Sequence, residues 1–457
     1  MHEELRRSIL TLAAVFAVSG AAEAAAPGAT IPPEESARAL QHTDQDHEVE
    51  GGARLTLDAA IDEALANNPE LVVLRRQFEA AQARPAQERF LAPPTFEAQI
   101  WQWPVDTVDP ANANMYMFMV GQEIPGLGKR RLREAAIDTE VQLADAEIAV
   151  RAREVVARVK RAYADLFLAR KTVEVHHDSV DLLRQLADTA QAKYATGRIS
   201  QQDVLKAVVE LSRIQDHLIG IEEGALLIEA RLNTLLDRPP HERIGPLVDP
   251  GERTLVPAVD VLQRLALEHQ PELVSARLVV GRADARLAVV ERDLLPDFFV
   301  MGGYMLMPDD RDAWMAKVGL TWPNAPWSRG RIAARQAEAA ADRAAAVARV
   351  RAVESALRLA VQEAYVRVKS AEQRAVLLRT TILPQADQVF EVSRVAYQAD
   401  QVNFSALVEN EQVWIDAQLD YFRALSDVEL ALADLERAVG VDLTASTMAA
   451  APTEGVE

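Results

Sequence analysis

The chain has 457 residues, of which 49% are hydrophobic, and its 49 basic and 69 acidic side chains give a formal charge of −20 at pH 7. Such an acidic protein is a poor partner for nucleic acid, because phosphate binding needs a basic surface. Cysteine is absent. The sequence therefore excludes disulfides and thiolate metal sites, and we expect no lipid-bearing N-terminal Cys.

The first residues have the pattern of an export signal. Arg6 and Arg7 precede an apolar run over 9–18, and Ala-Glu-Ala follows as a small-x-small cleavage site. We predict a signal peptide over 1–24 and an extended leader over 25–54; the alternative for the first segment is a fraying N-terminal helix. The apolar run is shorter than the roughly 20 residues of a membrane-spanning helix. Any membrane crossing is therefore expected to use strands.

The sequence repeats itself at a spacing of about 200 residues. Asn68-Pro69-Glu70-Leu71 returns as Gln270-Pro271-Glu272-Leu273. Further pairs keep nearly the same spacing: Phe96 with Phe298, Tyr163 with Tyr365, Tyr194 with Tyr397, and Leu232 with Leu435. We predict a tandem duplication with a first repeat over 55–250, a second over 251–441 and a mobile tail over 442–457.

Two long helices dominate each repeat. Residues 129–196 contain no Pro and no Gly, and an unbroken helix of that length would measure about 100 Å. Its counterpart over 331–399 contains Pro384, which should interrupt and kink it. Return helices over 200–236 and 403–438 carry apolar residues at the four-three spacing of coiled coils. The sequence thus predicts a mainly α protein of long antiparallel helices.

Four segments alternate like strands: 95–103, 115–124, 298–307 and 313–322. Each has about the 9 to 11 residues of a tilted membrane strand. One face of the last strand is apolar with Trp at both ends, and Lys317 lies on the other, a pattern typical of transmembrane barrels. The predicted aromatic girdle consists of Trp101, Trp103, Tyr116, Phe298, Tyr304, Trp314 and Trp322.

A soluble hairpin packed on helices is the alternative for these strands, because both faces of 115–119 are apolar. If they lie in a membrane, four strands are too few. Closure of a barrel needs about eight strands, and unpaired edges are not tolerated in lipid. We therefore expect an oligomer, with eight strands from two copies or twelve from three.

Three motifs make residues 55–441 resemble the TolC family of outer-membrane efflux channels. The first is Leu-x-x-Ala-x-x-x-Ala-Leu-x-x-Asn-Pro-Glu over 57–70, and the second is Gln-x-x-Pro-x-x-Gly-Lys over 122–129. The third is Tyr-x-x-Gly-x-Ile-Ser over 194–200, followed by Asp-Val-Leu at 203–205. The resemblance implies a homotrimer with a twelve-stranded barrel in outer-membrane lipid and a helical tunnel in the periplasm. It also implies a periplasmic adaptor protein and an inner-membrane efflux pump of the RND type as partners.

The resemblance places the functional residues at two helix-turn-helix tips, 194–203 and 397–409, which form the closed aperture and the docking end in the family. The residues matched to the aperture and its gate are Glu409, Asp400, Asp203 and Tyr397. The residues matched to tip docking are Tyr194, Gly197, Arg198, Ile199, Ser200, Gln401 and Val402.

Some tip residues depart from the family pattern. Ala406 stands where a second acidic residue is usual, and Val402 stands where an arginine often helps to hold the aperture shut. Asp400 replaces the tip glycine that the first repeat keeps at Gly197, where a left-handed turn favours Gly. We therefore expect gating to be concentrated at the second tip, around its weakened turn and Glu409.

Residues 122–131 look most like the heavy-metal branch of the family, which handles copper, silver, cobalt or zinc. Met115, Met117 and Met119 alternate along one predicted strand and would suit copper, but plain apolar filling is the favoured interpretation. The leader residues His42, Asp44, Asp46 and His47 also suggest at most a loose site. We predict no metal site and no cofactor.

Catalytic patterns are also missing from the sequence. The eight His are scattered, and Gly126-Leu127-Gly128-Lys129 imitates a phosphate loop but is followed by Arg130 where Ser or Thr is required. The predicted protein is not an enzyme. It is the passive outer-membrane exit duct of a tripartite efflux system, with heavy-metal cations among its candidate substrates. A periplasmic coiled-coil scaffold or adaptor without a pore is the alternative.

Overall fold

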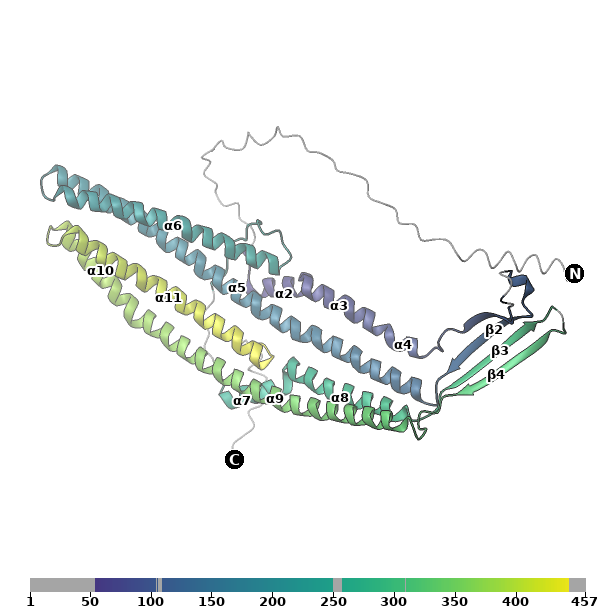
Figure 1. Cartoon of the computed structure of the whole chain (residues 1–457). Coiled ribbons are helices and arrows are strands. Elements are labelled where there is room, and N and C mark those ends of the chain that lie inside the picture. Colours follow the sequence, from purple (N-terminus) through teal and green to yellow (C-terminus); the bar gives the residue numbers. More distant parts are fainter. Residues whose placement is uncertain (1–53, 104, 106–108, 250–256, 309, 444–457) are drawn as a thin grey trace, which may run out of the picture. The chain divides into compact units, whose positions relative to one another are not determined.

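The structure, a computed structural model, describes residues 54–103, 105, 109–249, 257–308 and 310–443. The predicted signal peptide, nearly all of the leader and most of the tail lie outside these residues. Within them helices dominate, and four strands form one small sheet (Figure 1). This confirms the predicted fold class of a mainly α chain with a small β part.

The elements of the first repeat return in the second in nearly the same order. The first repeat consists of α2 (Leu57–Asn67), α3 (Pro69–Gln82), α4 (Arg84–Glu88), β1 (Thr95–Trp101), a 3₁₀ turn (Pro110–Asn112), β2 (Met115–Ile124), α5 (Lys129–Ala195) and α6 (Gln201–Leu235). The second consists of α7 (Val259–His269), α8 (Pro271–Arg292), β3 (Phe298–Leu306), β4 (Ala313–Leu320), α9 (Arg329–Leu377), a π turn (Leu378–Ile382), α10 (Leu383–Gln398) and α11 (Phe404–Val439).

The duplicated motif makes the same contact in both repeats. Asn68 donates its side-chain amide to the carbonyl of Leu235 at the end of α6 (3.0 Å). Gln270 donates in the same way to the carbonyl of Arg437 near the end of α11 (2.8 Å). These carbonyls have no partner within their own helices. The motif therefore joins the short helices of each repeat to the end of its return helix.

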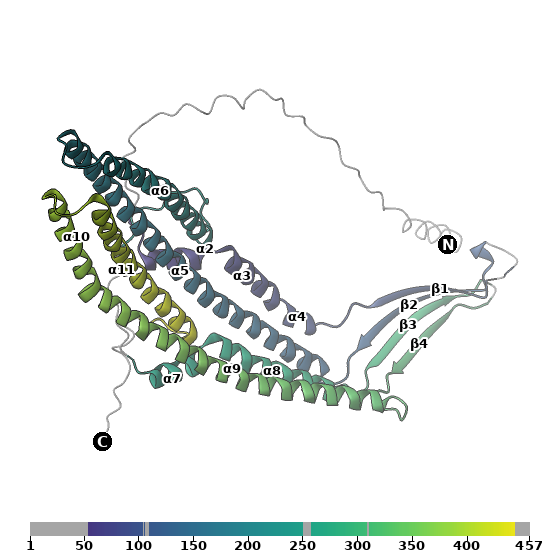
Figure 2. The ribbon, with the colours of Figure 1, turned by 60° about the vertical axis from the view of Figure 1, so that its left-hand side comes forward.

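Each repeat has its own apolar core where the short helices meet the long ones. The first core contains Ala60, Ala64, Leu71, Val155, Val159, Tyr163, Leu166 and Leu232. The second contains Leu262, Ala266, Val361, Val368, Val428, Leu432 and Leu435. Both lie along the middle of the long helices, which run side by side in both views (Figures 1 and 2). None of the helices within the described ranges is both long enough and apolar enough to span a membrane.

The predicted interruption at Pro384 takes the form of a π turn. The chain remains helical through α10, and the irregularity lies just before the proline, at Leu378–Ile382. Proline lacks an N–H and clashes with the carbonyl one turn earlier, and the wider π turn accommodates both effects. The hydroxyl of Thr380 donates to the carbonyl of Val376 (2.8 Å). The second long helix therefore continues to its tip.

The four strands form one antiparallel sheet in the order β1-β2-β3-β4, so the pairing of β2 with β3 joins the two repeats. Side chains alternate along each strand, and directly paired residues share a face. The outer face consists of Phe96, Ala98, Ile100, Tyr116, Phe118, Val120, Gln122, Ile124, Phe298, Val300, Gly302, Tyr304, Leu306, Trp314, Ala316, Val318 and Leu320. The inner face consists of Thr95, Glu97, Gln99, Trp101, Met115, Met117, Met119, Gly121, Glu123, Phe299, Met301, Gly303, Met305, Ala313, Met315, Lys317 and Gly319.

Three strands end before the predicted bounds. β1 ends two residues early because Gln102, with φ of 55°, leaves the extended region. β3 ends one residue early, where the N–H of Met307 donates to the Asp312 carboxylate (3.1 Å). β4 ends two residues early, since the N–H of Thr321 turns back to the carbonyl of Asp297 (2.9 Å). The paired parts of the strands are thus shorter than their apolar patterns.

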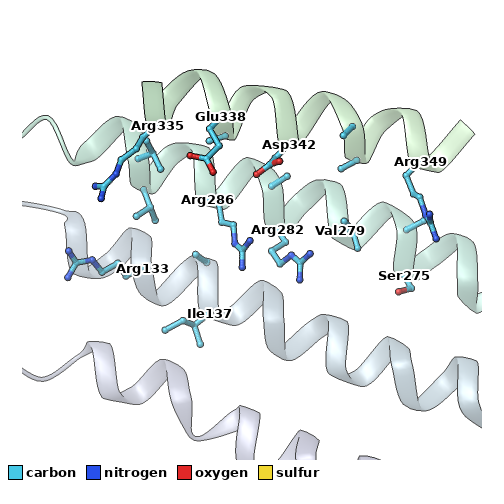
Figure 3. A pocket seen from close by; sticks show the side chains of 18 of the residues that line it. Arg133, Ile137, Ser275, Val279, Arg282, Arg286, Arg335, Glu338, Asp342 and Arg349 are labelled. Atoms are coloured by element: carbon cyan, nitrogen blue, oxygen red, sulfur yellow. The ribbon is translucent and has the colours of Figure 1, made fainter. Parts of the chain in front are cut away.

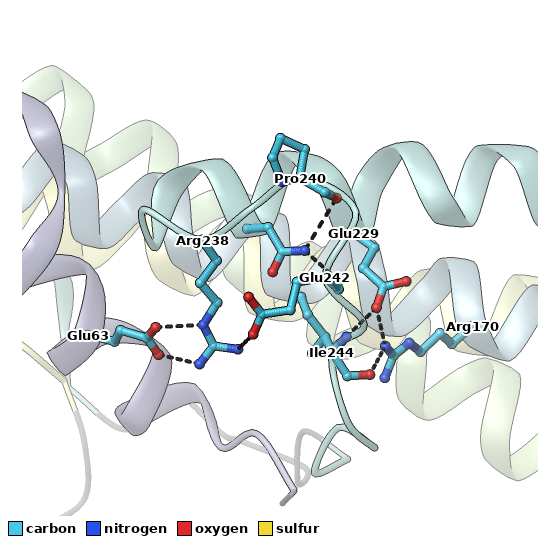
Figure 4. A network of polar contacts seen from close by, with 8 residues as sticks. Glu63, Arg170, Glu229, Arg238, Pro240, Glu242 and Ile244 are labelled. Atoms are coloured by element: carbon cyan, nitrogen blue, oxygen red, sulfur yellow. Dashed lines mark hydrogen bonds and ion pairs between the residues drawn. The ribbon is translucent and has the colours of Figure 1, made fainter. Parts of the chain in front are cut away.

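A polar network fixes the loop that leaves α6 (Figure 4). Arg238 donates two hydrogen bonds to Glu63 of α2 (2.6 and 2.5 Å). Arg170 of α5 donates to the carbonyl of Ile244 (2.7 Å) and to the carboxylate of Glu229 (3.3 Å). The end of the first repeat is therefore anchored to helices of the same repeat.

Polar contacts between α5 and α11 join the two repeats. Lys160, only 8% exposed, donates to Glu436, and the Glu436 carboxylate also accepts from the N–H of Leu443 (3.2 Å). Asp442 lies 3.7 Å from Lys160. Residues 442 and 443 of the predicted mobile tail are thus held by this cluster, and the rest of the predicted tail lies outside the described residues.

We expect Lys160→Met to lower the free energy of unfolding by about 3 kcal/mol, because it leaves the buried Glu436 carboxylate without its partner. Denaturant titration of the purified protein, followed by helical circular dichroism, measures this loss. Arg184→Met is the control, since Arg184 lies on the same helix as Lys160 and pairs with Asp181 of that helix near the surface. Equal losses in the two variants would contradict the role given to Lys160.

Candidate functional site

The two helical tips lie side by side at the end of the bundle away from the sheet (Figures 1 and 2). Gly197 and Asp400 occupy matching positions in the two turns, with φ of 75° and 58°. The second turn therefore keeps the left-handed geometry in spite of its Asp, at a conformational cost that Gly would avoid. Beneath the turns a shared apolar cluster contains Leu183, Leu186, Ala190, Ala207, Phe390, Tyr397, Phe404 and Leu407.

Lys193, in the last turn of α5, links the two tips. Its ammonium donates to the Asp400 carboxylate (2.6 Å) and to the carbonyl of Tyr397, and it lies 4.3 Å from the centre of the Tyr397 ring. Arg198 adds a weaker contact to Asp400 at 3.8 Å. The hydrogen bond from Lys193 lowers the pKa of Asp400. One cation of the first repeat thus holds three groups of the second, and we call this contact the tip latch.

The remaining predicted gate residues lie at different depths. Tyr397 is 2% exposed, its hydroxyl has no hydrogen-bond partner among the described residues, and burial raises its pKa. Asp203 lies in the first turn of α6 and accepts a hydrogen bond from the hydroxyl of Ser200 (2.9 Å). Its carboxylate therefore supports the start of that helix.

Glu409 lies on α11, beyond the tip latch, and is exposed. It lines a cleft of about 770 Å³ between α6 and α11, together with Lys206, Glu210 and Arg213. Lys206 crosses this cleft to the hydroxyl of Ser405 (2.9 Å). The structure therefore separates Glu409 from the other three predicted gate residues.

The residues predicted for docking divide into three groups. Tyr194, Arg198 and Gln401 are exposed at the tips. Ile199 and Val402 are partly buried against the shared apolar cluster. Gly197 and Ser200 shape the first turn, and the Ser200 hydroxyl accepts from the N–H of Asp203 (3.3 Å). A partner at the tips would therefore meet the first group.

Glu411 is a functional candidate that the sequence did not indicate. It is 1% exposed on α11, where one carboxylate oxygen accepts from the hydroxyl of Ser179 (2.9 Å) and the other has no partner among the described residues. Burial raises its pKa from 4.5 to about 7. It lines a cleft of about 480 Å³ with His176 and His217, whose rings are 5.3 Å apart. Within the described ranges no three His, Asp or Glu gather as metal ligands.

Some of the predicted girdle residues lie where expected and others do not. Tyr116, Phe298, Tyr304 and Trp314 are on the outer face, where Tyr304 and Trp314 pack edge to face at 5.3 Å. Trp101 is paired with Met115 and so lies on the inner face, which corrects its assignment to an outer girdle. Trp103 and Trp322 lie beyond the strand ends, and Trp322 packs on Trp327 instead (6.0 Å).

The inner face of the sheet carries a cluster of methionines. Met117, Met119 and Met301 are buried, and Met115, Met305, Met315 and Phe299 pack against them. Glu97 and Gln99 of β1 and Lys317 of β4 share this face. The outer face has no charged residue among its paired positions. The two faces are therefore chemically different, and the outer one suits lipid.

A cleft of about 1270 Å³ runs between α5, α8 and α9 (Figure 3). It is lined by Arg133, Arg282, Arg286, Arg335 and Arg349 and by Glu88, Glu272, Asp293, Glu338 and Asp342. The charges of the five arginines and the five carboxylates balance, so the lining favours neither anionic nor cationic ligands. We place no binding site here.

Five residues of these sites gave little or no signal in the sequence. Lys193 precedes the tip motif and could have been found as a cation in the last turn of a helix. Glu411 could not, because only packing shows its burial. Met301, Met305 and Met315 join the methionines of β2 only through strand register.

We expect the Glu411 carboxyl to make the protein less stable as pH rises. Its folded pKa of about 7 exceeds its ordinary value of 4.5, so the folded state holds the proton more tightly. The resulting stability is fully present below pH 4.5 and is lost by pH 8, a change of about 3 kcal/mol. Free energies of unfolding between pH 4.5 and 8 should therefore fall more steeply for wild type than for Glu411→Gln.

The difference between these two curves isolates Glu411 from the other titratable or charged groups that line its cleft, which are His176, His217, Glu210, Arg213, Asp416 and Arg423. Burial lowers the pKa of His176, which makes its contribution opposite in sign, lost as pH falls below about 6.5. Parallel curves for wild type and variant would show that Glu411 is ionised in the folded protein at neutral pH.

Comparison with known proteins agrees with this architecture. The profile of the outer membrane efflux protein family matches residues 60–238 and 262–441, one segment in each repeat. The cobalt-zinc-cadmium resistance protein CzcC of Cupriavidus metallidurans is 24% identical over 396 residues, which cover 86% of this chain and 91% of CzcC.

Solved structures share the fold. The outer membrane protein VceC of Vibrio cholerae matches with a TM-score of 0.68 at 18% identity, over 85% of this chain and 97% of VceC. CusC, which forms a transmembrane channel, matches with a TM-score of 0.70 at 13% identity, over 84% of this chain and 92% of CusC. Because the family profile matches most of both repeats, this chain belongs to the outer membrane efflux protein family.

Proposed function

We propose that the working channel is a homotrimer in which three sheets close one twelve-stranded barrel and the helices continue it as a periplasmic tunnel. The observation that carries this proposal is the sheet itself: four strands, an apolar outer face, and unpaired edges on β1 and β4 within the described chain. Edges of this kind cannot face lipid. Neighbouring copies of the chain supply the missing partners through the pairing of β1 with β4.

The proposed role is that of a passive exit duct in a tripartite efflux system. An inner-membrane pump of the RND type would supply the energy, and a periplasmic adaptor would connect the pump to the tips. The exposed side chains of Tyr194, Arg198 and Gln401 are the surface offered to that adaptor. The tip latch and Glu409 would act at the aperture, the latch by holding the tips together and Glu409 by its charge in the cleft between α6 and α11.

Heavy-metal cations are the proposed substrates. The support is the similarity to a protein named for resistance to cobalt, zinc and cadmium, which extends over most of both chains. A periplasmic scaffold without a pore, the alternative drawn from the sequence, is not favoured by any contact in the structure. Its hairpins would expose Phe96, Trp314 and Val318 to water, each more than 70% exposed on the outer face.

Purified protein reconstituted in planar lipid bilayers tests the duct. We expect discrete single-channel currents and, in detergent, a native mass three times that of the mature chain. A monomer that inserts no channels would contradict the proposal. A native mass of two chains together with channel currents would support the duct, but the barrel would then have eight strands and not twelve.

Lys193→Met should raise the open probability of these channels roughly tenfold, the factor that hydrogen bonds from one charged donor typically supply. The reason is that the variant frees the Asp400 carboxylate and the Tyr397 carbonyl together. Arg184→Met is the control, because Arg184 is equally basic, lies on the same helix and pairs only with Asp181 of that helix among the described residues. An unchanged open probability in Lys193→Met would show that the tip latch does not help to close the aperture.

A further inference from the structure

Six of the nine methionines of this chain lie on one face of one four-stranded sheet. They are Met115, Met117, Met119, Met301, Met305 and Met315, contributed by three different strands. The three outside this set include Met307, which follows β3, is partly buried and does not belong to the buried cluster. Apolar filling does not require this choice, because Leu or Val would fill a strand face as well.

Four of these methionines surround Gly303 on β3. Met119 of β2 is paired with Gly303 on one side, and Met315 of β4 is paired with it on the other. Met301 and Met305 lie two residues before and after it on the same face. Paired strands lie about 4.8 Å apart and alternate residues about 7 Å apart. Four flexible side chains therefore have their roots close enough to converge over one glycine.

Gly303 makes this convergence possible. A Cβ at this position would lie 2.7 Å from Cγ of Met119, so the Met119 side chain already occupies the space above the glycine. Met117, paired with Met305, extends the cluster by one row. Met117, Met119 and Met301 are each less than 9% exposed although they lie on an open sheet. The methionine side chains therefore cover one another.

The chemistry of this cluster is unusual for its place. The inner face of a transmembrane barrel is ordinarily polar, and here a patch of neutral sulfurs lies between Glu97 and Gln99 on β1 and Lys317 on β4. Thioethers are soft ligands that select monovalent copper and similar soft cations over the ions that prefer nitrogen or oxygen. Since the chain has no Cys, methionine is its sole source of sulfur ligands.

We propose that Met119, Met301, Met305 and Met315, with Met117 beside them, form a thioether site for a soft monovalent cation, Ag(I) or Cu(I), on the inner face of the sheet. The site rests on the proposed function in one respect, that the inner face lines the water-filled exit path. Glu97 is paired with Met119, and Lys317 is paired with Met301, so the cluster has an acidic side chain on one flank and a basic one on the other. Its selectivity for a cation therefore depends on the sulfurs and not on net charge. The site is a transient station on the path, built from neutral ligands that hold a soft cation without trapping it.

Silver nitrate in chloride-free buffer is the probe, applied to the purified wild-type channel in detergent. Bound silver is measured by mass spectrometry after desalting, and its neighbours by silver K-edge X-ray absorption. The test variant carries Met119→Leu, Met301→Leu, Met305→Leu and Met315→Leu, changes that keep the apolar volume and cost little stability. Met307→Leu is the control, because it removes a sulfur of the same hairpin outside the cluster.

We expect silver with sulfur neighbours in wild type and in Met307→Leu. The fourfold variant should bind silver with an affinity lower by ~10-fold or more, because mutating residues that merely support metal ligands already lowers metal affinity by about that factor. Zinc, offered at the same concentration, should not be retained by the cluster. Silver bound equally by all three proteins, or surrounded by nitrogen and oxygen alone in wild type, would overturn the proposal.

Single-channel currents separate this proposal from the proposed function. Currents from wild type and the fourfold variant, without sulfur-bound silver, would reject the thioether site and leave the duct intact. Absence of currents from wild type would reject the duct instead. If the fourfold variant does not assemble, the X-ray absorption of wild type and the pair Met301→Leu/Met315→Leu decide the matter.

Discussion

The outer edges of β1 and β4 carry rows of backbone N–H and C=O groups that no strand within the described chain satisfies. Water would satisfy them at little cost, but in hydrocarbon each unpaired group costs several kcal/mol. The outer face, with Trp314 82% exposed and Phe96 78% exposed, favours lipid over water. These two demands are compatible only if the edges pair with copies of the same chain. A single polypeptide therefore supplies only part of the circumference of the channel. This explains why its helices are far longer than a compact domain needs.

The duplication explains how such a long sector is held in shape. Asn68 and Gln270 perform the same task in the two repeats, and each repeat closes a core of its own around it. The contacts between repeats are of other kinds: a shared sheet near one end, the buried Lys160–Glu436 pair in the middle, and the tip latch at the other end. The tip latch pairs Lys193, whose side chain is 11% exposed, with Asp400, whose side chain is 41% exposed, above the apolar cluster that both tips share. Water therefore reaches this ion pair from the Asp400 side, and partly exposed ion pairs are weaker than buried hydrogen-bonded ones. The family resemblance puts the gate at the same place.

Sequence patterns predicted the parts of this structure that depend on local chemistry. The absence of Pro and Gly over 129–196 was enough to predict α5, and alternation was enough to find all four strands. The failures have a common physical cause, which is that faces and burial depend on pairing. Trp101 looked like an outer girdle residue until its register with Met115 placed it inside. Glu411 looks like any surface carboxylate of a heptad helix, and its burial against Ser179 is a property of two helices packed together. Lys193 gains its importance only because the second tip lies beside the first.

The inner face shows why glycine and large side chains occur together in this sheet. A Cβ at Gly121 would meet Phe299 at 3.0 Å, and one at Gly303 would meet Met119 at 2.7 Å, so each glycine lies beneath a large side chain from the neighbouring strand. A glycine at such a position lets the large neighbouring side chain pack close to the sheet, whereas a Cβ there would force that side chain away. Methionine is suited to this arrangement because it is unbranched and flexible. The glycine at 303 therefore gives Met119 room beside Met301 and Met315, its neighbours on the same face.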